Sequence, residues 1–186
     1  WQRVQQFMGE KSAYRYNPTF GYRKGQAFNS NRNAYHKPQI SLNHLWQIDH
    51  KSSLSTALYA SIGRGNGYSG TGTSAYRSKW YGANGYTNDE FRLADGTFNY
   101  DAVDALNQAS TTGSQMVMGK AMNNHEWYGL LSTYTTKFGE YLDFYGGVDL
   151  RYYKGLHQNI ITDLFSGSYF IDSNRDNVSA ANNIAA

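Results

Sequence analysis

The sequence predicts an all-β protein built from long antiparallel hairpins. Apolar and polar residues alternate at every second position through residues 124–154, which is the period of a β-strand. A short break at Gly139 and Glu140 divides this stretch into two strands, which we expect to form a hairpin. Each strand has about a dozen residues or more, whereas strands in soluble proteins have a mode of about 5–6. Because about 9–11 residues of a tilted strand cross a bilayer, this length favours a membrane-spanning barrel.

A second hairpin of the same design precedes the first in the chain. Its strands are predicted at residues 35–48 and 53–62, with a short break at residues 49–51. The segment before it, residues 9–33, is rich in Gly, Asn and Tyr and is predicted to be a loop. Aromatic residues spaced at two within that loop predict a short hairpin over residues 14–22.

A connection of about 58 residues, 65–122, lies between the two long hairpins. Connections of this length are usually functional or disordered. Residues 99–108 within it predict a short helix, with Asn99 or Asp101 as the N-cap. The run GRGNGYSG at residues 63–70 overlaps a dinucleotide-binding glycine pattern, but no βαβ unit is predicted around it. We therefore expect residues 63–70 to be a flexible surface loop.

Short breaks alternate with long connections along the chain, as in outer-membrane barrels, which have short periplasmic turns and long extracellular loops. This pattern places Asp49 and Glu140 at the periplasmic side and residues 65–122 outside the cell. The residues predicted to face lipid are Leu42, Leu58, Leu130, Phe144 and Leu150. The residues predicted to line the lumen are Ser53, Ser55, Tyr59, Thr133, Asp149 and Arg151.

The overall composition limits the classes of protein that the chain can belong to. With 40% hydrophobic residues and a mean hydropathy of -0.68, no stretch approaches the roughly 20 apolar residues of a transmembrane helix, which excludes an α-helical membrane protein. A net charge of +3 is too small and too scattered to predict nucleic-acid binding. The sequence has no Cys, which excludes a disulfide framework, a thiolate zinc site and a cysteine nucleophile.

Four runs of aromatic, Gly and polar residues are the most distinctive parts of the chain. They are SLSTALYASIGRG at residues 53–65, NNHEWYGLLS at 123–132, GGVDLRYYKGLH at 146–157 and YFID at 169–172. These runs resemble the mid-barrel region of SusC-like TonB-dependent outer-membrane receptors. The resemblance covers roughly residues 35–175.

The resemblance implies a barrel of about 22 strands with a plug domain, in the outer membrane of a Gram-negative bacterium. It also implies the import of a glycan or peptide nutrient, with a SusD-like surface lipoprotein as partner and energy supplied through the TonB complex. We expect residues 1–186 to be a partial barrel domain without a plug, a TonB box or a C-terminal closing strand. About four or five spanning strands cannot close even the smallest barrel, which has about 8.

Candidate ligand contacts lie in the long outer connection. The rings of Trp80, Tyr81 and Tyr86 could stack on sugar faces, and the amide of Asn84 could bond to hydroxyls. Packing of this loop against neighbouring loops is the alternative interpretation, and the residues alone favour it.

The sequence predicts neither a metal site nor an enzyme. Asp172, Asn174 and Asp176 imitate the first half of a calcium-binding loop, but Asn183 stands where a bidentate Glu is needed, so an Asx-turn is favoured. The five His residues are scattered without metal-ligand spacing, and no Ser lies in a nucleophile elbow. We therefore predict no catalytic residues and no cofactor.

Two other classes of protein fit parts of the pattern. A soluble or surface-tethered glycan-binding β-sandwich also has alternating strands, although the strand length and the asymmetry of the connections count against it. A passive porin would share the barrel but would have no plug. Folding in buffer without detergent distinguishes the sandwich from a barrel, because only the sandwich would fold there.

Overall fold

The computed structural model describes residues 5, 13–80, 89–172 and 184–185 of the chain. It divides into two compact units. The sheet unit consists of Ala34–Asn66 and Met122–Gln158. The core unit consists of Trp1–Asn33, Gly67–Ala121 and Asn159–Ala186.

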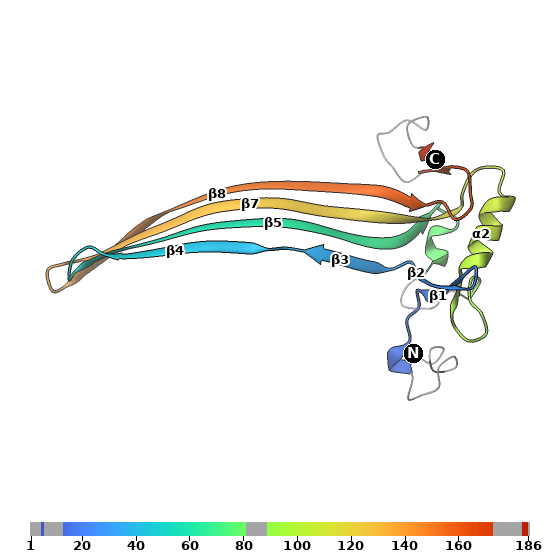
Figure 1. Ribbon diagram of the computed structural model, residues 1–186, viewed down its shortest axis with the longest axis horizontal. Helices are drawn as coiled ribbons and strands as arrows, with labels where there is room; N and C mark the ends of the chain where they lie inside the picture. The colour runs from blue at the N-terminus through green and yellow to red at the C-terminus, as the bar shows by residue number, and fades with distance from the viewer. Residues whose placement is uncertain (1–4, 6–12, 81–88, 173–183, 186) are drawn as a thin grey trace. The chain divides into compact units, whose positions relative to one another are not determined.

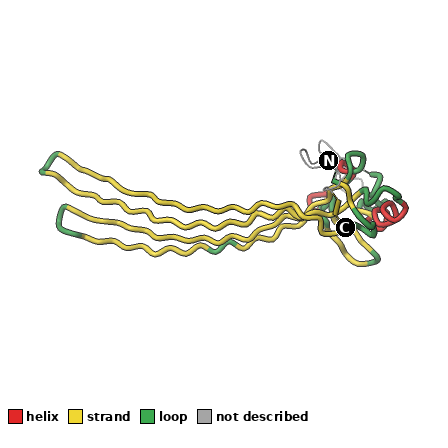
Figure 2. The backbone as a smooth tube through the Cα atoms, turned by 90° about the horizontal axis from the view of Figure 1, so that it is seen from above, coloured by secondary structure: helices red, strands yellow, loops and turns green. Residues whose placement is uncertain are grey.

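The sheet unit is made of long strands that lie side by side (Figures 1 and 2). The strands are β3 (Arg32–His36), β4 (Gln39–Gln47), β5 (Ser52–Gly72), β7 (Met116–Phe138) and β8 (Leu142–Asp163), of which residues 32–33, 67–72, 116–121 and 159–163 belong to the core unit. Their order is β3-β5-β7-β8, and β4 also pairs with β5. Among the described residues the sheet is open. On one side β4 pairs only with β5, and on the other side β8 pairs only with β7.

The register of the sheet separates its residues into two faces. Leu42 of β4 lies opposite Leu58 of β5 in an antiparallel ladder. Contacts between β5 and β7 run from Ser52 with Thr136 to Thr56 with Ser132, so this pair is also antiparallel. Even-numbered residues of the four long strands therefore share one face and odd-numbered residues share the other, as the alternation predicted.

Two short turns join the long strands at one end of the sheet unit (Figure 2). In the first, the Asp49 carboxylate accepts hydrogen bonds from the backbone N–H groups of Lys51 and Ser52, at 2.7 and 2.8 Å. This is the Asx-turn geometry that makes Asp a frequent turn residue. In the second, Gly139 has φ of +66°, a conformation that Gly adopts without a Cβ clash.

The core unit is organised around the helix α2 (Tyr100–Ala109). Asn99 is its N-cap, with its side-chain oxygen accepting from the backbone N–H of Ala102 at 3.0 Å. Of the two caps that the sequence allowed, the structure thus uses Asn99. The residues that α2 buries are Tyr100, Val103, Asp104 and Asn107, which lie on one side of a helix with 3.6 residues per turn.

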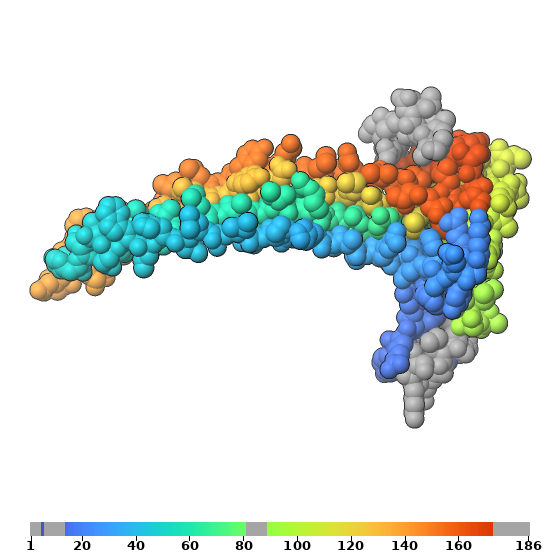
Figure 3. All heavy atoms as spheres, viewed as in Figure 1, coloured from blue at the N-terminus to red at the C-terminus, as the bar shows by residue number. Residues whose placement is uncertain are grey.

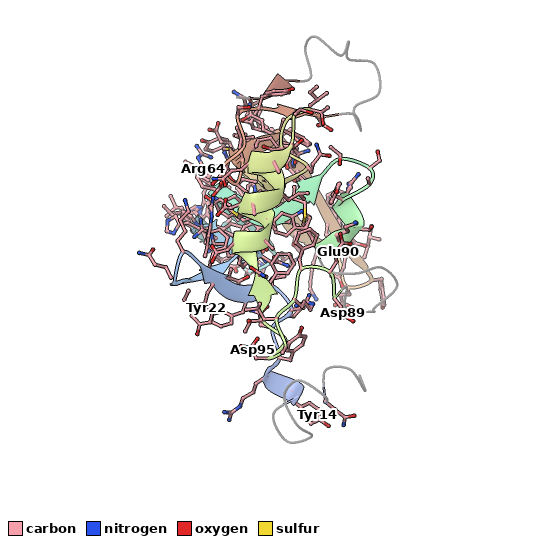
Figure 4. The ribbon with its side chains drawn as sticks, turned by 90° about the vertical axis from the view of Figure 1, so that its right-hand side faces the viewer. Tyr14, Tyr22, Arg64, Asp89, Glu90 and Asp95 are labelled. Carbon is pink, nitrogen blue, oxygen red and sulfur yellow. The ribbon has the colours of Figure 1, made fainter. Side chains whose placement is uncertain are left out.

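Small strands and short helical turns surround α2. A three-stranded sheet has the order β2 (Gln26–Asn29), β1 (Phe20–Arg23), β6 (Phe98–Asn99), in which β1 and β2 are antiparallel and β1 and β6 are parallel. The remaining elements are η1 (Ala13–Arg15), η2 (Arg77–Lys79), and the antiparallel pair β9 (Phe170–Ile171) and β10 (Ile184–Ala185). Figure 4 looks onto α2, with the exposed residues Tyr22 and Asp95 labelled near it.

Aromatic rings fill the core of this unit. The ring of Trp80 stacks on that of Phe98 with 5.3 Å between centroids, and Tyr100 stacks on Phe165 at 6.0 Å. The other buried members of the cluster are Phe91, Val103, Met116 and Met118. Each large side chain removed from water contributes about 1.5–3 kcal/mol, so this cluster is the main apolar contribution to the stability of the core unit.

Buried polar side chains connect α2 to the ends of the long strands. Asn107 donates to the carbonyl oxygens of Met116 and Leu164, at 2.7 and 2.9 Å, and accepts from the N–H of Gln115 at 2.8 Å. Asn107 is only 2% exposed. A buried amide is tolerated here because its donors and acceptor are satisfied.

The observed strands confirm the predicted all-β, antiparallel fold but are longer than predicted. Strand β5 continues to Gly72 and β7 begins at Met116, so the connection is shorter than residues 65–122. The prediction of a flexible loop at residues 63–70 was wrong, because these residues lie within β5. Glycines suit this strand since the rings of neighbouring side chains occupy the space where a Cβ would be: at Gly65 a Cβ would lie 2.2 Å from Cδ1 of Tyr35.

The predicted helix over residues 99–108 is confirmed as α2. The predicted short hairpin near residues 14–22 is found slightly later, as β1 and β2 over residues 20–29. Among the described residues, no helix has the length and hydropathy needed to cross a membrane.

Candidate functional site

The face formed by even-numbered residues of the long strands, here called the apolar face, carries a wide group of exposed hydrophobic side chains. Leu42 and Leu150 are 67% and 61% exposed. The other large exposed members are Ile40, Trp46, Leu58, Ile62, Tyr128, Phe138, Leu142, Phe144, Val148, Tyr152 and Leu156. Figure 3 shows one broad side of the sheet unit, where the side chains of the long strands form the surface without a further layer over them.

The five residues predicted to face lipid belong to this apolar face. Leu42 and Leu58 are paired directly across the β4–β5 ladder. Leu130 and Leu150 line a shallow groove of about 650 Å³ together with them. The ring of Phe144 lies edge-on to that of Phe138, with 6.3 Å between centroids. The sheet therefore brings all five onto one surface.

Hydroxyl groups on the apolar face bond to each other. The hydroxyl oxygens of Thr56 and Ser132 are 2.9 Å apart, and those of Ser52 and Thr136 are 2.8 Å apart. In an apolar solvent an unpaired hydroxyl is costly, by roughly 2–7 kcal/mol depending on the reference state. Pairing across the strands removes part of that cost, so these four residues are compatible with an apolar environment.

The opposite face, formed by odd-numbered residues and here called the polar face, carries charged and hydroxyl side chains. Arg151 donates from Nε to Oδ1 of Asp149 at 2.8 Å, and a second hydrogen bond runs from Nη2 to Oδ2. Such bidentate pairs hold both side chains in one geometry. Ser53, Ser55, Tyr59 and Thr133, which the sequence predicts to line a lumen, also belong to the polar face.

Four aromatic side chains form a row across three strands of the polar face, here called the aromatic cluster. The ring of Trp127 is edge-on to both Tyr59 and Tyr153, with centroid separations of 6.2 and 6.3 Å. The imidazole of His125 stacks near Tyr153 at 6.3 Å. Each such ring pair contributes about 0.5–1.5 kcal/mol beyond the area that it buries, so the cluster keeps these rings in place.

A glycine makes room for the aromatic cluster. At Gly129 a Cβ would lie 2.1 Å from Cζ of Tyr59, so the ring of Tyr59 lies directly against the backbone of β7. Two nitrogens of the cluster, Nε2 of His125 and Nε1 of Trp127, are buried without a hydrogen-bond partner within the part of the chain that the structure describes. The cluster thus presents ring edges and faces rather than a completed hydrogen-bond network.

Of the candidate ligand residues in the long connection, the structure describes only Trp80. Trp80 is fully buried in the core unit, where its Nε1 donates to the carbonyl oxygen of Thr71 at 2.7 Å. A buried ring cannot stack on a sugar from solvent, so the proposed stacking by Trp80 was wrong and the alternative of internal packing holds for it. Tyr81, Asn84 and Tyr86 lie outside the described residues.

The calcium-like segment is described only at its first residue. Asp172 is within the described structure, whereas Asn174 and Asp176 lie outside it. Within residues 13–80 and 89–172, no group of three or more His, Cys, Asp or Glu side chains is placed to hold a metal ion.

Charged groups in turns and in the core unit have pKa values set by local hydrogen bonds. The backbone N–H of Lys51, followed by that of Ser52, lowers the pKa of the Asp49 carboxyl. Burial alone would raise the pKa of Asp104, but hydrogen bonds from Arg23 and Ser166 hold it below its usual value of 3.8. The same pairing, foremost with Asp104, raises the pKa of Arg23.

These observations define an antiparallel all-β protein whose long strands carry one mainly apolar face, which also holds the Arg64–Glu126 ion pair, and one polar face. No known protein family matches the chain, and no curated protein matches its sequence. The resemblance to SusC-like receptors therefore remains a prediction.

Sequence reasoning placed the two faces but missed the aromatic cluster. The sequence does contain a signal for this cluster, because His125, Trp127 and Tyr153 all occupy odd positions of the predicted strands and so share a face. What the sequence lacked was the register between strands, which decides that Tyr59 lies over Gly129 and beside Trp127.

Proposed function

We propose that the chain forms part of the wall of an outer-membrane transporter, with its apolar face against lipid and its polar face toward the solute pathway. In this proposal the strands belong to a larger barrel of the SusC-like, TonB-dependent type. The cargo is a glycan or peptide nutrient, the surface partner is a SusD-like lipoprotein, and energy comes from the TonB complex. The role is transport, without catalysis.

The observation that carries the proposal is the exposed apolar face on strands of 21–23 residues. Monomeric soluble proteins rarely expose a contiguous apolar patch larger than a few hundred Å². A soluble β-sandwich would cover such a face with a second sheet. The large side chains of this face are exposed within the described chain, and lipid is a solvent in which that exposure carries no penalty.

The polar face supports the second half of the proposal. Its Asp149–Arg151 pair would be costly against lipid, where charged side chains on a barrel strand are unfavourable by about 2–4 kcal/mol near the midplane. Facing an aqueous pathway, the pair remains hydrated. The aromatic cluster on the same face offers ring surfaces of the kind that contact sugars or apolar peptide side chains.

The proposal is tested by labelling adjacent residues of one strand. Because the chain has no Cys, single substitutions Phe144→Cys and Tyr145→Cys each provide one attachment site for a fluorophore. In protein reconstituted into lipid vesicles, we expect a lipid-borne quencher to act on position 144 and a water-soluble quencher to act on position 145. The single substitutions Leu42→Cys and Asn43→Cys, at adjacent residues of β4, repeat the comparison on a second strand.

Equal quenching at positions 144 and 145 by both agents would contradict the membrane role. A chain that instead remains soluble and cooperatively folded in buffer, with both labels open to the aqueous quencher, would support the glycan-binding sandwich. Retention of the lipid pattern in a complete protein that has no plug would favour the porin.

A further inference from the structure

The core unit contains a polar pocket that the proposed transport role does not require. Its volume is about 340 Å³, which is near the lower end of the range of about 300–1,000 Å³ for small-molecule sites. Its lining includes odd-numbered residues of three adjacent strands: Ser69 and Thr71 of β5, Gly119 and Ala121 of β7, and Asn159 and Ile161 of β8. We propose that this pocket binds a small hydroxylated carboxylate.

Small residues on the middle strand create the space. At Gly119 a Cβ would lie 3.6 Å from the carbonyl oxygen of Ile160 and 3.7 Å from Cγ2 of Thr71, which are ordinary contact distances. The backbone therefore does not require glycine at this position. A side chain added there would extend toward Thr71, one of the residues that line the pocket.

Two cations line the pocket, Lys120 of β7 and Arg77 of η2. Within the described residues the guanidinium of Arg77 makes no ion pair, in contrast to Lys79 two residues later, whose Nζ is 2.7 Å from a carboxylate oxygen of Glu90. A guanidinium presents a planar fork of donors that matches a carboxylate. Of the two cations, Arg77 is thus the one whose geometry matches a carboxylate.

The remaining lining combines polar side chains, which suit hydroxyl groups, with the apolar side chains of Ile160, Ile161 and Phe170. Ser69 and Thr71 supply hydroxyls and Asn159 supplies an amide, each able both to donate and to accept. Asp172 also lines the pocket and has its own interaction within the protein. The negative charge of Asp172 repels the ligand carboxylate and accepts hydrogen bonds from the ligand hydroxyl groups. The carboxylate is therefore expected to lie at Arg77. Lys120 lines the pocket at an even-numbered position, and its Nζ lies 5.8 Å from the ring centroid of Tyr68.

The test compares two probes of nearly equal size, D-glucuronate and D-glucose, which differ in carrying a carboxylate or a hydroxymethyl group. Isothermal titration calorimetry on the full chain in detergent micelles measures both affinities. We expect glucuronate to bind at least about tenfold more tightly, since a hydrogen bond to a charged group is stronger than one between neutral groups. The inference concerns the core unit and holds whether or not the sheet unit faces lipid.

Two variants and a control make the test specific. Arg77→Gln is expected to weaken glucuronate binding by roughly tenfold and to leave glucose unchanged. Gly119→Leu fills the pocket and is expected to abolish binding of both probes. Arg15→Gln changes an exposed cation of η1 and is expected to alter neither.

Unaltered near-ultraviolet circular dichroism, which reports the buried rings around Trp80, shows that each variant retains its core. Failure of glucuronate to bind the wild-type chain, equal affinity for the two probes, or an unchanged affinity in Arg77→Gln would each overturn the inference. None of these results bears on the quenching test of the membrane role, so the two proposals fail separately.

Discussion

At the scale of single residues, the buried ion pair of the core unit has the clearest energetic role. Arg23 donates from Nε and Nη2 to the two carboxylate oxygens of Asp104, at 2.8 and 2.7 Å, and from Nη1 to Asp163. Its guanidinium also lies over the ring of Phe165, 4.4 Å from the centroid. One side chain of β1 is thereby connected to α2 and to the end of β8, which are distant in the sequence.

Replacement of Asp104 by Asn is expected to destabilise the core unit at neutral pH. Removing one partner of a buried pair leaves a charge that is only partly compensated, at a cost of about 3–5 kcal/mol; the remaining bond to Asp163 places the expected loss near the lower end. The measurement is the free energy of unfolding from denaturant titration, with Asp101→Asn, an exposed residue of the same helix, as the control.

The pH dependence of this variant follows from the lowered pKa of Asp104. Because the carboxyl is more acidic in the folded chain, its contribution to stability is complete above its usual value of 3.8 and is lost as the pH falls through the lower folded value. The difference between wild type and Asp104→Asn should therefore shrink below about pH 3.8. A difference that stays constant down to pH 2 would show that the charge of Asp104 is not the cause.

At the scale of elements, glycine positions decide how side chains from neighbouring strands fit together. The Gly-rich run at residues 63–70 has the composition of a loop, and composition alone therefore predicts a loop there. In the structure it is a strand that lies beneath bulky rings, with Gly63 under His125 and Gly70 under Trp80. Composition describes the strand alone, whereas the need for glycine comes from residues that are distant in the sequence.

Substitution of Gly129 by Val is expected to displace Tyr59 and disrupt the aromatic cluster. The new Cβ would overlap the Tyr59 ring, and overpacking of this kind costs about 1–3 kcal/mol. The shift in unfolding midpoint in detergent measures the effect. Gly119→Ala is the matched control on the same strand, because its Cβ meets only ordinary contacts. Equal losses in the two variants would mean that the clash with Tyr59 does not determine the cost.

At the scale of the whole molecule, the exposed apolar face decides which solvent the chain prefers. We expect the purified 186-residue chain to aggregate in buffer and to gain β-structure in detergent, because detergent covers the exposed side chains of β4, β5, β7 and β8. Sedimentation and far-ultraviolet circular dichroism in the two solvents measure this. A monomeric, cooperatively folded chain in buffer would favour the soluble binding module.

The hairpins, the helix α2 and the membership of the two faces could be predicted from the sequence, because each depends on a local period or a local cap. Leu42 and Leu58, for example, pair across the β4–β5 ladder and so share a face, as their even positions predict; that this face meets lipid stays a prediction. The extension of β5 and β7, the burial of Trp80 and the aromatic cluster could not be predicted, since they depend on pairing between residues far apart in the chain. Trp80 in particular is buried by Phe98, Tyr100 and Phe165, which no local pattern connects to it.

The two short turns have a consequence for the order in which the sheet forms. Each brings together strands that are adjacent in sequence, β4 with β5 and β7 with β8, so each hairpin has low contact order and can form early. The pairing of β5 with β7 must instead close the long connection between Gly72 and Met116. A hydrogen bond from the N–H of Thr73 to the carbonyl oxygen of Gln115, at 3.0 Å, joins the two ends of this connection. Loop-closure entropy makes the pairing of β5 with β7 the slow step. Two preformed hairpins, joined late by the α2-containing connection, are therefore the expected folding intermediates of this chain.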